Sequence, residues 1–153
     1  MAYDNMIRLP QETFDPCKLM HEKGWIVVPE MEDRRSLEMV LIDMRFVTRL
    51  SVKKAHVAES IEGGERLKRI QATGLVRLHP AFLPAIFRKP FKLPESWRIG
   101  ADTYTGFDGA VLRDKNGHNH TVGVVTNGLH NAFLHVTKMQ GEPCYDPSAV
   151  LIG

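Results

Sequence analysis

The sequence predicts an α+β fold in which N-terminal helices pack on an antiparallel sheet built around a C-terminal three-stranded meander (108–139). Two Asn-Gly pairs, Asn116-Gly117 and Asn127-Gly128, separate three segments of alternating apolar and polar residues. Asn-Gly favours tight hairpin turns, because both central residues of a type I′ turn need positive φ. Upstream, apolar residues recur at helical spacing between 32 and 50. Together these patterns indicate helices first and a meander last.

The length and composition indicate one domain covering residues 1–153. An apolar content of 43% and a charged content of 25% are typical of a soluble globular chain. We expect 1–14 to form an irregular arm, because it has no period, and 140–153 to form a C-terminal tail that folds back on the body. There is no run of eighteen apolar residues, no basic-apolar leader and no paired cysteine spacing. A cytoplasmic protein without membrane insertion is therefore expected.

The N-terminal half should be mainly helical. Asp15-Pro16 is typical of a helix start, so a short helix is expected from Pro16 to about Lys23, followed by a strand at 25–28. The stretch 32–50 is the longest expected helix, and Ser51 could cap a second one ending near residue 61.

The helices and strands in the middle of the chain should be short. A helical turn is expected at 65–71, with Arg66, Lys68 and Arg69 exposed, then strands at 73–79 and 97–101. Between these strands, prolines at 80, 84, 90 and 94 exclude a continuous helix and a central strand. Because this segment is also rich in apolar residues, we expect an ordered loop or short helical turns against the core.

The two Asn-Gly pairs also predict a register. If each is a two-residue turn, Arg113 lies opposite His120, and His120 lies opposite His135. Directly opposite residues share a face of the sheet. One face would then gather Arg113, His118, His120, His135 and Thr137. This prediction is conditional, because a slip of one residue in either pairing moves side chains to the other face.

A metal site is one chemistry that such a cluster permits. His118 and His120 are two residues apart on one strand, and His135 would face them from the next. Three imidazoles could hold zinc or iron and leave a position open for water. We do not favour this cofactor over the alternatives.

Acid–base catalysis without a metal is the second possibility. Histidines titrate near neutral pH, so His120 and His135 could take and give a proton. Arg113 beside them could stabilise a developing phosphate charge. These are the groups that cleavage of RNA or a cyclic nucleotide requires.

The charge distribution favours a third possibility, binding without chemistry. Residues 34–98 hold fourteen basic and six acidic side chains, net +8, in a chain whose net charge is +2. Cations interleaved with aromatic residues suit a polyanion with bases to stack. The residues expected to contact such a ligand are Lys53, Lys54, Arg88, Lys89 and Trp97.

The expected function is therefore that of a small binding or regulatory protein. Its anticipated ligand is a nucleic acid or a nucleotide, held by the basic middle and by the Arg/His face of the meander. Two alternatives stay open: an enzyme that uses the histidine cluster, and a module that binds another protein. The sequence leaves the oligomeric state open.

Overall fold

The computed structural model describes residues 5–54, 60–98, 102–128, 131–141 and 143–152, and the fold is α+β as expected. An eight-stranded sheet dominates it, with the order β2-β7-β8-β6-β10-β4; β5 pairs with β10, and β9 pairs with β8. The strands are β2 (Ile26–Val27), β4 (Val47–Leu50), β5 (Val76–Arg77), β6 (Thr103–Gly106), β7 (Leu112–Arg113), β8 (Asn119–Asn127), β9 (Asn131–Lys138) and β10 (Ser148–Leu151). Pairing is antiparallel throughout except between β10 and β6.

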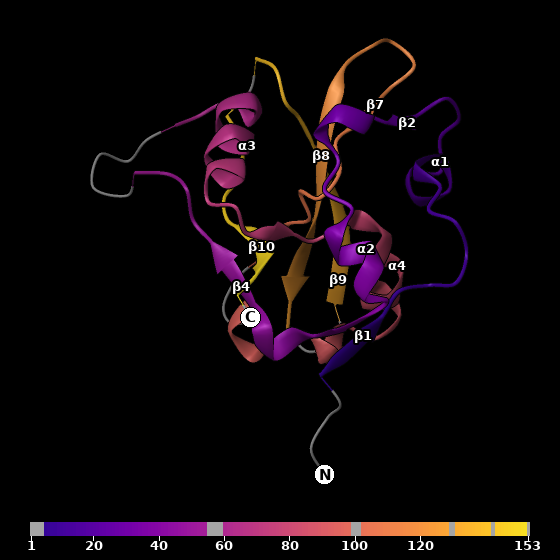
Figure 1. Cartoon of the computed structure of the whole chain (residues 1–153), viewed down its shortest axis with the longest axis vertical. Helices are drawn as coiled ribbons and strands as arrows, with labels where there is room; N and C mark the ends of the chain where they lie inside the picture. The colour runs from indigo at the N-terminus through magenta and orange to yellow at the C-terminus, as the bar shows by residue number, and fades with distance from the viewer. Residues whose placement is uncertain (1–4, 55–59, 99–101, 129–130, 142, 153) are drawn as a thin grey trace.

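Short helices flank this sheet. The α-helices of the described residues are α1 (Pro16–Met20), α2 (Arg35–Met39), α3 (Gly63–Ala72) and α4 (Leu83–Arg88). In Figure 1, α3 lies to one side of β8 and β9, and α1, α2 and α4 lie to the other. The main apolar core forms between the sheet and the side that carries α1, α2 and α4. Phe82, Leu83, Ile86, Val122 and Val124 are buried in it.

The predicted helix over 32–50 is wrong. Only α2 and the 3₁₀ turn η2 (Met44–Phe46) are helical there, and α2 ends at Val40, whose φ of 61° is incompatible with a continuing right-handed helix. Beyond it, β3 (Leu41–Asp43) pairs with β1 (Met6–Arg8), and β4 pairs with β10. β-Branched Ile42 and Val47 become buried in these strands, so sheet pairing overrides the helical spacing.

The two chain ends are also more ordered than expected. Part of the predicted irregular arm forms β1, and Leu9 N donates to Val40 O at 2.6 Å. The predicted C-terminal tail contains β10, which is buried along all four residues and pairs with β4, β5 and β6. A run of Ser-Ala-Val-Leu without alternation is what a strand covered on both faces requires.

The proline-rich segment forms short helical turns against the core, as predicted. It contains α4 and the 3₁₀ turns η4 (Pro80–Phe82), η5 (Pro90–Lys92) and η6 (Glu95–Trp97). η6 covers the start of the strand expected at 97–101, where Trp97 is buried, and 99–101 lie outside the described residues. The helix expected after Ser51 falls partly on 55–59, which are likewise outside them.

Four smaller expectations are confirmed in outline. α1 starts where predicted, with Asp15 accepting a hydrogen bond from Cys17 N at 2.9 Å. It ends earlier than predicted, because His21 takes the left-handed conformation. β2 and β5 lie within the predicted strands 25–28 and 73–79, and α3 extends the helical turn expected at 65–71.

Candidate ligand-binding site

The first hairpin of the meander has a different register from the predicted one. Arg113 pairs with Asn119, and Leu112 pairs with His120. The Asp114 carboxylate accepts hydrogen bonds from Asn116 N and His118 N at 2.8 and 3.0 Å. These bonds organise a longer loop, closed by a bond from Asp114 N to His118 O at 2.9 Å. Because of this slip, Arg113 and His120 lie on opposite faces.

The register of the second hairpin, between β8 and β9, also differs from the predicted one by an odd number of residues. Asn127 pairs with Asn131, so His120 lies opposite Lys138 and His135 lies opposite Gly123. His120 and His135 are therefore on opposite faces of the sheet. The ring of His135 contacts those of Tyr104 and Tyr145, with centroids 5.5 and 4.8 Å away.

The predicted histidine cluster is consequently not assembled. The expected set of His118, His120 and His135 for zinc or iron is split across the sheet, and so is the acid–base pair of His120 and His135 with Arg113. Within the described parts of the chain, no group of three His, Cys, Asp or Glu residues is arranged to hold a metal. The predicted register, on which a shared catalytic centre on one face depended, is thus wrong.

His120 instead belongs to a local clamp. Its Nε2 lies 2.9 Å from Asp114 Oδ2, and its ring stacks on Trp25 with a centroid distance of 4.7 Å. The hydrogen bond with His120, helped by the backbone N–H groups of His118 and Asn116, lowers the pKa of Asp114 to about 2. This arrangement fixes the β7–β8 hairpin against the strand that follows Trp25.

Much of the predicted basic charge is paired with carboxylates of the same chain. Arg66, expected to be exposed, is 1% exposed, and its Nη1 donates to Asp108 Oδ1 at 2.7 Å. Burial opposes its charge, but the neighbouring Asp108 carboxylate raises the pKa of Arg66. Further cations of the middle region pair with nearby carboxylates: Arg35 with Asp33, Arg45 with Asp43, and Arg69 with Glu65.

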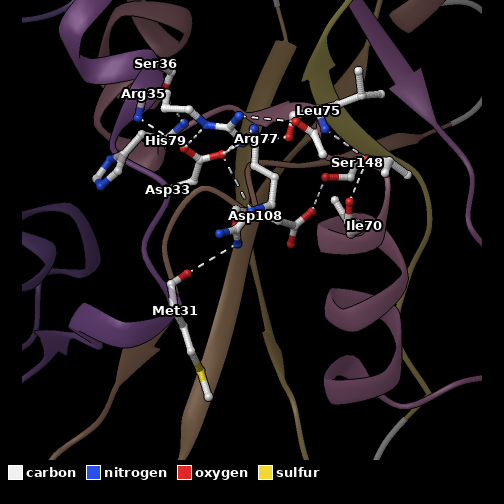
Figure 2. Close-up of polar contacts among 12 residues, drawn as sticks. Met31, Asp33, Arg35, Ser36, Ile70, Leu75, Arg77, His79, Asp108 and Ser148 are labelled. Carbon is white, nitrogen blue, oxygen red and sulfur yellow. Dashed lines mark hydrogen bonds and ion pairs between the residues drawn. The ribbon is translucent and has the colours of Figure 1, made fainter.

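The contacts Arg66–Asp108 and Arg35–Asp33 belong to a largely buried polar network, which Figure 2 shows around Arg77. Arg77 donates through Nη1 to Asp108 O at 2.7 Å and through its backbone N to Asp33 Oδ2 at 3.0 Å. Arg35 donates to both oxygens of Asp33, and Ser148 Oγ donates to Asp108 Oδ2 at 2.5 Å. Burial would raise the pKa of Asp33, but the hydrogen bonds from Arg35 and Arg77 outweigh it and lower the pKa to about 2.

His79 joins this network to the molecular surface. Its Nδ1 accepts from Ala81 N at 3.0 Å, so Nε2 carries the proton and donates to Glu32 at 2.7 Å. Burial lowers the pKa of His79, although the hydrogen bond with Glu32 opposes this shift. The ring meets Phe14 edge-on with a centroid distance of 5.0 Å. No sequence pattern predicts this network, because its members are far apart in the chain and form no motif.

The residues predicted to bind a ligand have separate fates. Trp97 is 2% exposed and packs in the core, so it offers no stacking surface. Lys53 and Lys54 lie beyond β4 and line neither of the hollows described next. Arg88 and Lys89, at the end of α4, do lie at a surface depression.

That depression begins as an apolar hollow of about 680 Å³ between the N-terminal segment, α4 and β9. This depression is called the apolar hollow. Its apolar wall includes Phe14, Leu19, Pro84, Phe87, Ala132 and Leu134. Its rim is polar, but both carboxylates among its described lining residues are already engaged: Glu12 bonds Lys18 at 2.9 Å, and Asp15 caps α1. A concave, mainly apolar surface of this size is typical of a ligand site.

A second depression of about 300 Å³ continues from the first and is called the basic hollow. Its charged residues are Arg8, Arg88, Lys89 and Lys92, and the lining residues that the structure describes include no carboxylate. Lys92 donates to Met6 O, whereas Arg8, Arg88 and Lys89 are exposed, and their side chains make no hydrogen bond or close ion pair with the described residues. The pKa of Glu12 is lowered chiefly by Lys18, and the charge of Arg88 adds to this effect. Arg88 and Pro10 line both hollows, so the two form one groove.

None of the described helices is both long and apolar enough to pass through a membrane. No protein-family model, no curated protein and no solved structure matches this chain.

Proposed function

We propose that the protein binds an organic anion in the groove formed by the apolar and basic hollows. The apolar body of the ligand occupies the larger hollow, and its phosphate or carboxylate lies against Arg8, Arg88 and Lys89. One observation carries this proposal: Arg88 lines both hollows, so an apolar surface and a set of exposed cations without a close ion pair in the described residues meet at one residue.

The electrostatics support an anion at this position. Three exposed cations line the basic hollow, whose described lining residues include no carboxylate, and their mutual repulsion is relieved when an anion binds. The two carboxylates of the apolar hollow, Glu12 and Asp15, are bonded to Lys18 and to the start of α1. An apolar wall next to them lowers the local dielectric, which strengthens the attraction. A mononucleotide and an aliphatic carboxylate both have the required chemistry, whereas the metal and acid–base alternatives lack an assembled centre.

The test uses 1-anilinonaphthalene-8-sulfonate, whose aromatic body carries one anionic group. We expect saturable binding at one site and about tenfold weaker binding in Arg88→Glu, because a charge-assisted contact becomes a repulsive one. The exposed residue Lys68, on α3, provides the matched control, and Lys68→Glu should change affinity less than twofold. Circular dichroism should show both variants folded, since the dye also binds partly unfolded states.

An uncharged analogue separates the two parts of the groove. N-Phenyl-1-naphthylamine should bind the wild-type protein and Arg88→Glu equally, because it has no group for the basic hollow. Competition with AMP and with laurate then compares an aromatic base with an acyl chain in the apolar hollow. Equal affinity of the anionic dye for the wild-type protein and Arg88→Glu would refute the proposal.

A further inference from the structure

The outer edge of β9 has no strand beside it in the described structure. β9 pairs with β8 over eight residues and with no other described strand. Its register is continuous and without a bulge, and Asn131–Lys138 contains no proline and one charged residue, Lys138. Proteins normally protect such an edge with charge, proline, a bulge or a cover, because it can pair with another strand.

The phase of the ladder shows which residues offer free backbone groups. Met139 N donates to Asn119 O at 2.9 Å, so this pair is a hydrogen-bonded one. Hydrogen-bonded and non-hydrogen-bonded pairs alternate along antiparallel strands. The N–H and C=O groups of Ala132, Leu134 and Val136 therefore point away from β8.

Two of these three residues also line the apolar hollow. Ala132 and Leu134 form its β9 wall, and both are only partly buried. A ligand in the hollow thus lies next to main-chain donors and acceptors spaced for a β-strand, with the cations of the basic hollow beyond α4. Extended peptides bind in this manner elsewhere, with main-chain bonds for affinity and side-chain pockets for specificity.

We propose that the ligand is an extended peptide segment of a partner protein, added to the sheet at the outer edge of β9. Its main chain pairs with Ala132 and Leu134, an apolar side chain enters the apolar hollow, and an Asp, a Glu or a terminal carboxylate reaches Arg88. This inference rests on the proposed function, because it names the class of anion that the groove accepts.

A second copy of the chain fits the same edge less well. The β9 segment of another molecule brings Lys138 as its charged residue, so a β9–β9 pair would leave Arg8, Arg88 and Lys89 without anions. A nucleic acid supplies anions but no regular main-chain N–H and C=O groups to match those of Ala132 and Leu134. An acidic peptide satisfies both requirements.

The experiment starts from the whole chain and a display library of random octapeptides. We expect enrichment of sequences that combine apolar residues with at least one Asp or Glu. A labelled consensus peptide is then measured by fluorescence anisotropy against the wild-type protein, Arg88→Glu and Lys68→Glu. Binding should weaken about tenfold in Arg88→Glu and change less than twofold in Lys68→Glu.

Strand pairing is tested from both sides of the contact. Ala132→Pro removes an outward N–H and leaves the bonds to β8 intact, a position where an edge strand tolerates proline. This variant should bind the peptide at least tenfold more weakly, while its own melting curve still shows a folded protein. N-methylation of the peptide at alternate residues should abolish binding in one phase and be tolerated in the other. Hydrogen exchange should show new protection at the amides of Ala132 and Leu134.

The outcomes separate this inference from the proposed function. Absence of enriched peptides, with Arg88-dependent dye binding retained, overturns the peptide inference alone. Peptide binding that is indifferent to Ala132→Pro and to N-methylation overturns strand pairing. A dimer in sedimentation that Ala132→Pro dissociates, or Arg88-dependent binding of an RNA oligonucleotide, identifies another occupant and also overturns it. Loss of Arg88 dependence for every probe overturns both proposals.

Discussion

The buried polar network and the basic hollow use the same kinds of cation in opposite ways. In the network, Arg66 and Arg77 are almost fully buried, and Asp108 accepts a hydrogen bond from each of them. In the basic hollow, Arg88 and Lys89 are exposed, and no described carboxylate lines the depression. One set of charges is committed to the fold, and the other is free to meet a ligand.

This difference shows that a count of basic residues does not identify a binding surface. A buried guanidinium has lost its hydration, and a paired carboxylate offsets that cost. An exposed cation keeps its hydration and can exchange water for a ligand at small cost. The middle region is strongly basic as a sequence, but part of that charge serves internal pairs such as Arg35 with Asp33.

The largest effect on stability is expected from a substitution of Asp108. Replacing this residue by Ala removes the carboxylate that neutralises Arg66, a side chain with 1% exposure. We expect Asp108→Ala to lower the free energy of unfolding by about 3–5 kcal/mol, because an uncompensated buried charge remains. Urea denaturation followed by circular dichroism measures the change.

The control is an ion pair of the same type at the surface. Glu12 and Lys18 have side chains 77% and 73% exposed, so Glu12→Ala should leave the free energy of unfolding almost unchanged. If Asp108→Ala costs no more than Glu12→Ala, the network is not the stabilising element that its burial indicates.

The sequence predicts the fold class and the meander because those depend on local patterns. Asn-Gly pairs, the Asp15 cap and the prolines of 80–94 act within a few residues, and the structure follows them. The failures arise where distant partners decide. The helical spacing of 32–50 is overridden by strands from both ends of the chain, β1 and β10, which no local pattern reveals.

The site was less predictable than the fold. The histidine cluster depended on two exact turn lengths, and the Asp114 side chain, which bonds the backbone of its own loop, changes one of them. Arg88 and Lys89 were identified as cations near aromatic residues, but nothing in the sequence places them beside Arg8 or β9. Trp97 illustrates the opposite error, since an aromatic residue among cations proves to be core.

Acid should weaken the network through Asp33, whose side chain is 5% exposed. The pKa of Asp33 is lowered to about 2 from an ordinary value of 3.8. Its contribution, on the order of 2 kcal/mol, is therefore complete above about pH 4 and is lost as the pH falls through about 2. Denaturation of the wild-type protein and Asp33→Asn across this range measures it. The two stability curves should converge in acid, and parallel curves would contradict the assignment.

The smallest effect on stability is expected at the basic hollow, and it completes the comparison. The double variant Arg88→Gln, Lys89→Gln removes two exposed charges that have no ion pair in the described structure. Its free energy of unfolding should stay within about 0.5 kcal/mol of the wild-type value. Arg88 ends α4, so a small loss of favourable interaction with the helix dipole opposes the relief of repulsion between the cations.

The same double variant should still lose the anionic dye. Anisotropy and denaturation measured on one preparation would then show a change in binding of about tenfold without a matching change in stability. If the free energy of unfolding of the double variant fell by more than about 1 kcal/mol, these cations would stabilise the fold like those of the buried network. Unchanged stability with weakened binding distinguishes exposed cations that bind a ligand from buried ion pairs that stabilise the fold. Replacing an exposed cation leaves no buried carboxylate without its partner, whereas breaking a buried pair does.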